Sequence, residues 1–435
     1  MIEPVVDDSL SRLVVGFGRN KSLPLFRLFP FREGFSTFLV ETMLSKYGID
    51  RGVLLDPFCG GGTAPYVATK LGMQGVGMEI HPVARLISDM KNIPHRLSES
   101  NIMDLSDVVS FGPDLWESQF LQEEYMILRT TKGAYPRETA RSIRKYRGYC
   151  LQYGDLLGKV LDFALLCVLE SVSYTRKDGQ FLRWDSRSRH GRGKFCKGEI
   201  LDFNDAIRHK LVEVRQDIHE ERRSGREVFK VLDGSCLDLL PKRCGDSVDC
   251  VFTSPPYLNR YDYTRTYALE LAMLGYTDEM VGSLRQRMLS ATVENRPKDL
   301  SAANPEWSGV VNSCLEDEHV SKVLSRFSDG EVVSSLNNKC VPRMVRGYFT
   351  EMACVIHECC RSLRSGGYMF MVNDDVQYSG VHIPVGVILS SLAEKSGFEV
   401  DSIRVLPRGK GNSSQQMGKF GRKELHKCVC VWRKP

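Results

Sequence analysis

The stretch Val251-Phe-Thr-Ser-Pro-Pro-Tyr257 places two successive prolines directly after an apolar run. Residues Val248 to Thr253 predict a buried strand, because β-branched and apolar residues dominate them. Neither proline can donate a ladder hydrogen bond, so the strand must end there, with Ser254 and Tyr257 on a stiff turn. In open α/β sheets, ligands bind at the carboxyl ends of strands. The turn is therefore a candidate site, although an X-Pro-Pro turn can also simply end a strand.

A glycine-rich loop lies nearer the N-terminus. Residues 53–55 predict a short strand, followed by Asp56-Pro-Phe-Cys-Gly-Gly-Gly-Thr63 and a helix over residues 64–71. Glycines allow a tight turn close to a ligand, and the helix start presents unpaired amide groups. A second strand over residues 74–78 ends at Glu79, where a carboxylate can accept hydrogen bonds from ribose hydroxyls. The loop matches neither G-x-G-x-x-G nor the P-loop, so a nucleoside-type ligand is favoured over a dinucleotide or ATP, with a purely structural turn as the alternative.

Composition narrows the class of protein. The chain has 435 residues, 42% hydrophobic and 26% charged, which is typical of soluble globular proteins. It contains no apolar run near 18 residues, and residues 1–8 lack the layout of a signal peptide, so we expect no membrane span and a cytoplasmic protein. The 14 cysteines include no Cys-x2-Cys pair, which predicts reduced, mostly buried thiols and no structural metal.

Positive charge is concentrated in a few segments. The net charge is only +5, but residues 129–147 and 404–427 are strongly basic. A third segment, 175–194, mixes basic residues with Phe181, Trp184 and several glycines. Such runs are often solvated faces, yet together they favour a partner lined with phosphates.

Strands and helices alternate along most of the chain. Further strands are predicted at residues 228–232, 368–372, 399–405 and 428–432, and further helices at 36–47, 268–274, 349–363 and 385–395. The pattern predicts an α/β fold with a doubly wound, mostly parallel, seven-stranded Rossmann-like sheet. Residues 277–345 are polar with weak periodicity, which indicates a mobile segment near the site.

One segment is too long for an ordinary connection. Residues 92–227 contain an apolar helix at 151–170, the basic loop at 175–194 and an amphipathic helix at 200–223. We expect a helical insertion and a candidate DNA-recognition region there, with a solvated packing subdomain as the alternative. The catalytic domain would then comprise residues 1–91 and 228–435.

The two motifs together resemble the DNA amino-methyltransferases that use S-adenosyl-L-methionine. Asp56-Pro-Phe-Cys-Gly-Gly-Gly-Thr63 precedes Thr253-Ser-Pro-Pro-Tyr257, and the Ser-Pro-Pro-Tyr form is similar to the cytosine-N4 branch. The likeness extends over most of the chain outside the insertion. In that family the target-recognition region commonly lies between the third and fourth conserved motifs or after the last one, whereas the large insertion here lies between the second and third. Which segment would read the DNA sequence therefore stays open.

The resemblance implies roles for individual residues. The cofactor-binding residues would be Phe29, Pro30, Asp56, Pro57, Phe58, Cys59, Gly60, Gly62, Thr63, Glu79, Ile80, Ser235, Cys236 and Asp238. The catalytic residues would be Ser254, Pro255, Pro256 and Tyr257. The basic and polar segments suggest DNA contacts from Arg176, Lys177, Arg183, Arg187, Arg408, Lys410, Asn412, Ser413, Ser414 and Gln415.

The expected activity is site-specific methylation of the cytosine N4 amino group in duplex DNA. Ser254 and the backbone carbonyl before Pro255 would accept the amino protons, and Tyr257 would stack on the extruded base. The enzyme would belong to a restriction-modification or phage-defence system, with a cognate endonuclease or defence protein as a candidate partner. Methylation of adenine-N6 or of RNA is the alternative within enzymes, and a catalytically silent DNA-binding scaffold is the alternative outside them.

Overall fold

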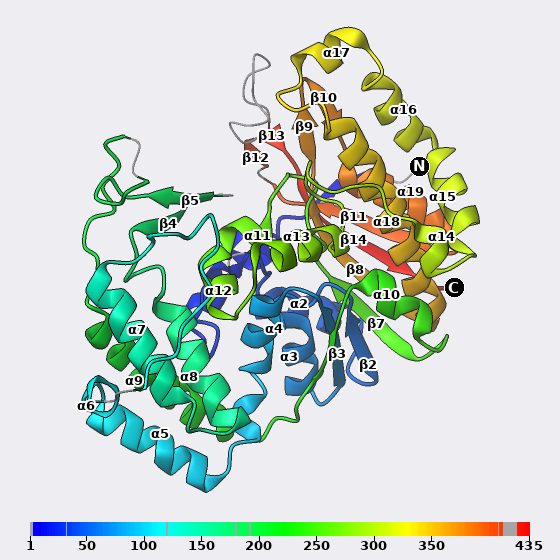
Figure 1. Cartoon of the computed structure of the whole chain (residues 1–435). Helices are drawn as coiled ribbons and strands as arrows, with labels where there is room; N and C mark the ends of the chain where they lie inside the picture. Colours follow the sequence, from blue (N-terminus) through cyan, green and yellow to red (C-terminus); the bar gives the residue numbers. More distant parts are fainter. Residues whose placement is uncertain are drawn as a thin grey trace.

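The structure is a computed structural model that describes residues 3–31, 33–118, 121–178, 181–190, 193–407, 409–411 and 424–435. Within these ranges the central sheet has eight strands. Their spatial order is β1 (Val5–Val6), β11 (Glu399–Val405), β14 (Lys427–Arg433), β8 (Leu363–Asp374), β7 (Val248–Thr253), β2 (Val53–Asp56), β3 (Gln74–Glu79) and β6 (Lys230–Asp233) (Figure 1).

The sheet is mostly parallel, as the alternation of strands and helices predicted. Only β14 runs against its two neighbours, β8 and β11, among the described strands. Seven of the eight strands correspond to those predicted from the sequence. The eighth, β1, has two residues, which is too short for a strand pattern to be visible in the sequence.

Helices cover both faces of the sheet, because successive residues of each strand point to opposite sides. Leu55 packs in the core with α10 (Cys236–Leu239), α18 (Val341–Ser362) and α19 (Val385–Lys395). Its neighbour Leu54 packs in the core with α1 (Arg12–Val15), α2 (Thr37–Lys46) and α3 (Thr63–Lys70). Figure 1 shows the sheet between these layers. The 3-10 helix η1 (Phe17–Ser22) joins α1 to the segment before α2.

The polar segment 277–345 is largely helical, which its weak periodicity did not predict. It contains α13 (Asp278–Arg287), α14 (Leu300–Ala303), α15 (Trp307–Leu315), α16 (Glu318–Arg326) and α17 (Gly330–Ser335). Asp299, Asp317 and Asp329 each cap the helix that follows with a side-chain oxygen. Because the helices are short, each buries few residues, and the caps themselves make the sequence polar. Trp307 is nevertheless fully buried in the core with α18.

The junction of α18 and β8 differs from the prediction. The helix begins at Val341 rather than Phe349, and β8 begins directly at Leu363. The pair Gly366-Gly367 therefore lies inside the strand and does not separate it from the helix. Val248 pairs with Leu363 but Cys250 pairs with Tyr368, so the extra residues of β8 form a bulge in which Gly366 has a φ of 79°.

Residues 92–227 form a largely helical body at one side of the sheet (Figure 1). Its helices are η2 (Ile93–His95), α5 (Glu99–Phe111), α6 (Asp114–Glu117), α7 (Arg137–Cys150), α8 (Asp155–Val168) and α9 (Phe203–Arg222). The basic segment after α8 forms a hairpin of β4 (Thr175–Asp178) and β5 (Phe181–Trp184). These helices share one hydrophobic core with α4 (Pro82–Asp89), α12 (Ala268–Met273) and α13. The body is therefore packed directly on the elements that surround the site.

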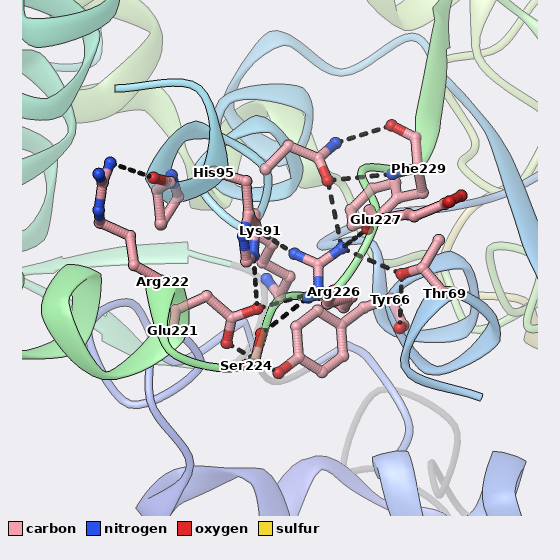
Figure 2. A network of polar contacts seen from close by, with 12 residues as sticks. Tyr66, Thr69, Lys91, His95, Glu221, Arg222, Ser224, Arg226, Glu227 and Phe229 are labelled. Atoms are coloured by element: carbon pink, nitrogen blue, oxygen red, sulfur yellow. Dashed lines mark hydrogen bonds and ion pairs between the residues drawn. The ribbon is translucent and has the colours of Figure 1, made fainter. Parts of the chain in front are cut away.

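A buried polar network fixes the return of this body to the sheet (Figure 2). The guanidinium of Arg226, which is 2% exposed, donates to Glu221 at the end of α9 at 2.9 Å. It also donates to Thr69 of α3 at 3.0 Å, and Tyr66 donates to the same Glu221 carboxylate at 3.1 Å. Removing one member of a buried ion pair leaves the other charge uncompensated, at a cost of about 3–5 kcal/mol. The network therefore holds α9 against α3, which follows the glycine loop.

Two hairpins and two short helices complete the described elements. They are α11 (Tyr263–Thr266), η3 (Leu240–Lys242), the hairpin β9 (Val376–Tyr378) with β10 (Val381–Ile383), and the hairpin β12 (Lys410–Gly411) with β13 (Glu424–Leu425). Figure 1 shows both hairpins at the end of the sheet where β8 ends. None of the helices in the described ranges combines the length and apolar character that crossing a membrane requires.

Candidate active site

The glycine loop and the diproline corner leave adjacent parallel strands. Strands β2 and β7 pair with Leu54 opposite Cys250. At their carboxyl ends, Thr253 Oγ1 donates to Asp56 Oδ1 at 2.6 Å, and the amide of Phe58 donates to the same oxygen at 3.0 Å. Asp56 is thus buried and links the two motifs by hydrogen bonds. Burial raises the pKa of its carboxyl to about 7.

A pocket of about 780 Å³ lies between the glycine loop, the tip of β3 and the corner. Most of the residues predicted to bind the cofactor line it: Pro57, Phe58, Cys59, Gly60, Thr63, Glu79, Ile80, Ser235 and Cys236. Ser254 and Pro256 of the corner line the same pocket. We call it the glycine-loop pocket.

Glu79 is held in place by the backbone. Gly60 N donates to Glu79 Oε2 at 2.7 Å, and His81 N donates to Glu79 Oε1 at 2.6 Å. Burial raises the pKa of this carboxyl to about 7, against the lowering effect of these amides. Each carboxylate oxygen has further acceptor capacity, so Glu79 can still accept hydrogen bonds from a ligand in the pocket. Gly60 has a φ of 52°, and a Cβ there would lie 3.0 Å from Phe31, so a side chain would crowd the loop.

Five predicted cofactor residues lie outside this lining. Asp56 is buried beneath the loop, and Gly62 caps α3 with a φ of 81°. Asp238 has a side chain that is 52% exposed and lies 3.8 Å from Arg287. Phe29 and Pro30 line the neighbouring pocket instead. Asp56 and Gly62 therefore shape the loop without lining the pocket, and Asp238 does not line it either.

His81 lines the glycine-loop pocket but was not predicted from the sequence. Its side chain is only 2% exposed. Neither ring nitrogen has a hydrogen-bond partner within the described part of the chain. Burial lowers its pKa to about 3, so the imidazole is neutral at physiological pH. A buried imidazole without partners is costly unless a ligand satisfies it. The sequence signal was weak, since a histidine before the helix-starting Pro82 also reads as an ordinary cap.

A second, larger pocket of about 1430 Å³ adjoins the first. Pro255 and Tyr257 line it, so alternate residues of the corner face the two pockets. The other walls come from distant parts of the chain. They are Val15, Gly16, Phe29, Pro30, Glu33, Gly34, Phe35, Leu166, Cys167, Glu170, Lys177, Asn259, Tyr261, Tyr263, Thr266, Tyr267, Glu270, Asp374 and Lys427. We call it the target pocket.

Glu33 lines both pockets and was also missed by sequence reasoning. Tyr267 OH donates to Glu33 Oε2 at 2.7 Å, and Tyr261 OH donates to the other carboxylate oxygen. Both tyrosines come from the segment that follows the corner, and they line the target pocket. The carboxylate therefore ties the segment before α2 to the segment after β7.

The predicted DNA-contacting residues fall into four groups. Arg176 on β4 is exposed. Arg183 lies 3.1 Å from Asp178, and Arg187 makes two hydrogen bonds to Asp185, at 2.7 and 2.9 Å. Lys177 faces the target pocket, where its ammonium donates to Glu270 at 2.5 Å. Arg408 and the run Asn412, Ser413, Ser414 and Gln415 lie outside the described residues, and of Lys410 only the backbone is described.

A doubly wound sheet with a glycine loop, an acid at the next strand tip and a pocket between them suits an enzyme that uses a nucleoside-containing cofactor. Comparisons with known proteins identify the family within this class. The chain is 45% identical over 445 residues to the Type II methyltransferase M.AvaI of Nostoc sp., covering 98% of this chain and 90% of that protein. It is 34% identical over 466 residues to the Type II methyltransferase M.BsoBI of Geobacillus stearothermophilus, covering 98% and 89%.

The chain therefore belongs to the Type II methyltransferases, a family of restriction-modification enzymes, and its methyl donor is S-adenosyl-L-methionine. No family model matches the chain. Among solved structures, TrmN from Thermus thermophilus aligns with 94% of this chain and 52% of its own at 8% identity, with a TM-score of 0.30.

Proposed function

We propose that this chain transfers a methyl group from S-adenosyl-L-methionine to the N4 amino group of cytosine at a specific site in duplex DNA. The observation that carries the proposal is the division of the Ser-Pro-Pro-Tyr corner between two pockets. Ser254 and Pro256 line the glycine-loop pocket, whereas Pro255 and Tyr257 line the target pocket. A donor in one pocket and an acceptor base in the other would meet at this rigid turn.

The glycine-loop pocket suits the methyl donor chemically. Glu79 offers carboxylate oxygens for ribose hydroxyls, and Phe58 and Leu289 supply apolar walls for an adenine ring. His81 adds two buried ring nitrogens without partners in the described chain, which polar groups of the donor would satisfy. Held by these residues, the donor would supply an electrophilic methyl group to the target nitrogen, and the electron pair of the broken carbon–sulfur bond would stay on sulfur.

The role of the corner is to prepare the nucleophile. The lone pair of an exocyclic amino group is conjugated with its ring and attacks poorly. Ser254 Oγ and the carbonyl oxygen before Pro255 would accept the two amino protons, which draws the nitrogen toward tetrahedral geometry. The methylated nitrogen would then release one proton to solvent. Because two prolines fix the turn, the acceptors need no reorganisation during transfer, and alignment in the two pockets supplies the rest.

The substrate would be duplex DNA with one base extruded. The target atom is inaccessible inside a stacked helix, and extrusion costs a few kcal/mol. The target pocket is lined by Tyr257 and Tyr263, whose rings suit stacking on a base, and it adjoins the β4–β5 hairpin through Lys177. The exposed Arg176 on that hairpin would contact phosphates. We place the enzyme in the cytosol, in a restriction-modification or phage-defence system with a cognate endonuclease.

The decisive test identifies the product. The protein is incubated with plasmid DNA and S-adenosyl-L-methionine, the DNA is digested to nucleosides, and the methylated base is identified by mass. N4-methylcytosine is expected. Recovery of 5-methylcytosine alone would rule out attack by an exocyclic amine, and the chain has no Pro-Cys dipeptide to serve a covalent route.

The alternatives predict other outcomes of the same assay. Methylation of adenine-N6 would give N6-methyladenine, and methylation of RNA would give a product only with RNA as substrate. A silent scaffold would give no product and would bind no labelled S-adenosyl-L-methionine in equilibrium dialysis. We favour cytosine because Ser254 stands where Asp or Asn would favour adenine by the family resemblance.

A further inference from the structure

A chain of polar contacts runs from the diproline corner to the last strand of the sheet. Ser254 Oγ donates to the hydroxyl oxygen of Tyr257 at 3.0 Å. Lys427 Nζ donates to the same oxygen at 2.9 Å and lies 3.2 Å from Asp374 Oδ1. Lys427 and Asp374 are register partners on β14 and β8. The four side chains therefore link the corner to two strands that follow it by more than a hundred residues.

Lys427 is held as a cation next to the corner. Its side chain is 22% exposed, as is that of Asp374, and both line the target pocket. Although burial alone would lower it, Tyr257 and Asp374 raise the pKa of the Lys427 ammonium above its usual value. The ammonium also lies 4.7 Å from the centroid of the Tyr257 ring. The side chain is therefore charged throughout the pH range in which the enzyme would work.

An ammonium donates hydrogen bonds and cannot accept them, so its contact with Tyr257 has only one possible direction. The phenol oxygen must accept from Lys427, and the geometry of its contact with Ser254 has it accept the Ser254 hydroxyl proton as well. The Ser254 proton then points toward Tyr257, and the lone pairs of Ser254 Oγ stay available to a substrate. Without the ammonium, the phenol and hydroxyl protons could reorient, and Ser254 could present a donor instead.

We propose that Lys427 is a positioning residue for methyl transfer, whose ammonium keeps the Tyr257 hydroxyl as an acceptor and so keeps Ser254 Oγ as an acceptor for the target amino group. Asp374 holds the ammonium in place from the other side. The inference rests on the role proposed above for Ser254. A purely structural pair between β14 and β8 would make the same contact with Asp374, but would not act on the rate through Tyr257.

The test is a double-mutant cycle of Lys427→Met and Tyr257→Phe in the full chain, with single-turnover rates at saturating labelled S-adenosyl-L-methionine and DNA. Lys427→Met is expected to lower the rate about tenfold, in line with the net contribution of one orienting hydrogen bond that does not itself contact the substrate. Its dissociation constant for S-adenosyl-L-methionine should change less than twofold. In the Tyr257→Phe background, where the oxygen is absent, Lys427→Met should have almost no further effect. Lys427→Arg, which also only donates, should restore part of the rate.

Two controls separate this role from simple destabilisation. The variant Lys427→Met with Asp374→Asn removes the unpaired carboxylate, and it should keep the slow rate while regaining thermal stability. Equal loss of rate from Lys427→Met with and without the Tyr257 hydroxyl would overturn the role of Lys427 while leaving the proposed function intact. A wild-type chain that methylates no nucleic acid would overturn the proposed function and this role together.

Discussion

The two pockets of the site are built in different ways. The glycine-loop pocket is lined mainly by three short segments, residues 57–63, 78–81 and 234–236, at the tips of neighbouring parallel strands. The target pocket draws its walls from the β4–β5 hairpin, α8, α12 and the strands β8 and β14. One pocket is thus a product of local sequence at strand ends, and the other is a product of tertiary packing.

Their polar contacts differ in the same way. Glu79 in the glycine-loop pocket is held by the amides of Gly60 and His81, which lie close to it in the chain or on the adjacent strand tip. The target pocket instead contains the ion pairs of Lys177 with Glu270 and of Lys427 with Asp374. Changes in the first pocket should therefore alter cofactor affinity, whereas changes in the second should alter transfer or DNA binding.

The largest expected effect tests the corner between the pockets. Ser254→Ala removes one preorganised hydrogen-bond acceptor for the target amino group. It should lower the single-turnover rate by about 10²-fold. Binding of S-adenosyl-L-methionine, measured by calorimetry, should stay within twofold because Glu79 and the glycine loop are unchanged. Unchanged turnover would remove Ser254 from the reaction, and a parallel loss of cofactor affinity would mean that the corner belongs to the first pocket alone.

A smaller effect is expected within the glycine-loop pocket. Glu79→Gln should weaken binding of S-adenosyl-L-methionine about tenfold, since hydrogen bonds to a charged acceptor contribute about 1.5–3 kcal/mol. The matched control is Asp238→Asn, because Asp238 is a predicted cofactor residue whose side chain is 52% exposed outside this pocket. Its affinity should equal that of the wild type. Equal losses in both variants would show that the lining of the pocket does not determine cofactor binding.

The carboxyl of Glu79 predicts a pH dependence of cofactor binding. The pKa of Glu79 is raised to about 7 by burial, and the ionised form is the one that accepts ribose hydroxyls. As pH falls through 7, a growing fraction of Glu79 is protonated in the ligand-free protein, so the affinity should fall. With this pKa the loss between pH 8 and pH 6.5 is about fourfold. The slope should vanish in Glu79→Gln, and a slope that persists there would assign the titration to Asp56, whose pKa is also about 7.

The sequence predicted the first pocket far better than the second. The strand before each motif, the glycine loop and Glu79 all lie where strand patterns and turn chemistry indicated. These features are local, because a parallel strand ends where its own residues stop it. His81 was not predicted, because its notable property is that its buried ring nitrogens have no hydrogen-bond partner in the described part of the chain, and only the packed structure shows this. The role of Lys427 was not predicted for a similar reason, because the pairing of β14 with β8 brings its side chain to Tyr257.

The basic segments of the sequence predicted the roles of individual residues less well than the patterns of strands and turns did. Lys177 and Arg176 are neighbours in one basic segment, and composition alone predicted the same role for both. On a strand, adjacent side chains point to opposite faces. Arg176 is accordingly exposed, while Lys177 faces the target pocket and is 17% exposed. The alternation could have been applied once the hairpin was recognised, but the glycines of the segment favoured a loop.

The smallest expected effect distinguishes the roles of Arg176 and Lys177. Arg176→Gln removes an exposed charge that would contact a phosphate, so the slope of log affinity against log salt concentration should decrease by about 0.9 in magnitude. Lys177→Met, combined with Glu270→Gln to avoid an unpaired carboxylate, should leave that slope unchanged because the ammonium is already neutralised at 2.5 Å. Fluorescence anisotropy with a duplex oligonucleotide at several salt concentrations measures both slopes. Equal decreases would mean that the hairpin reorients on DNA and that Lys177 contacts the backbone, which would join the target pocket to the phosphate-binding surface.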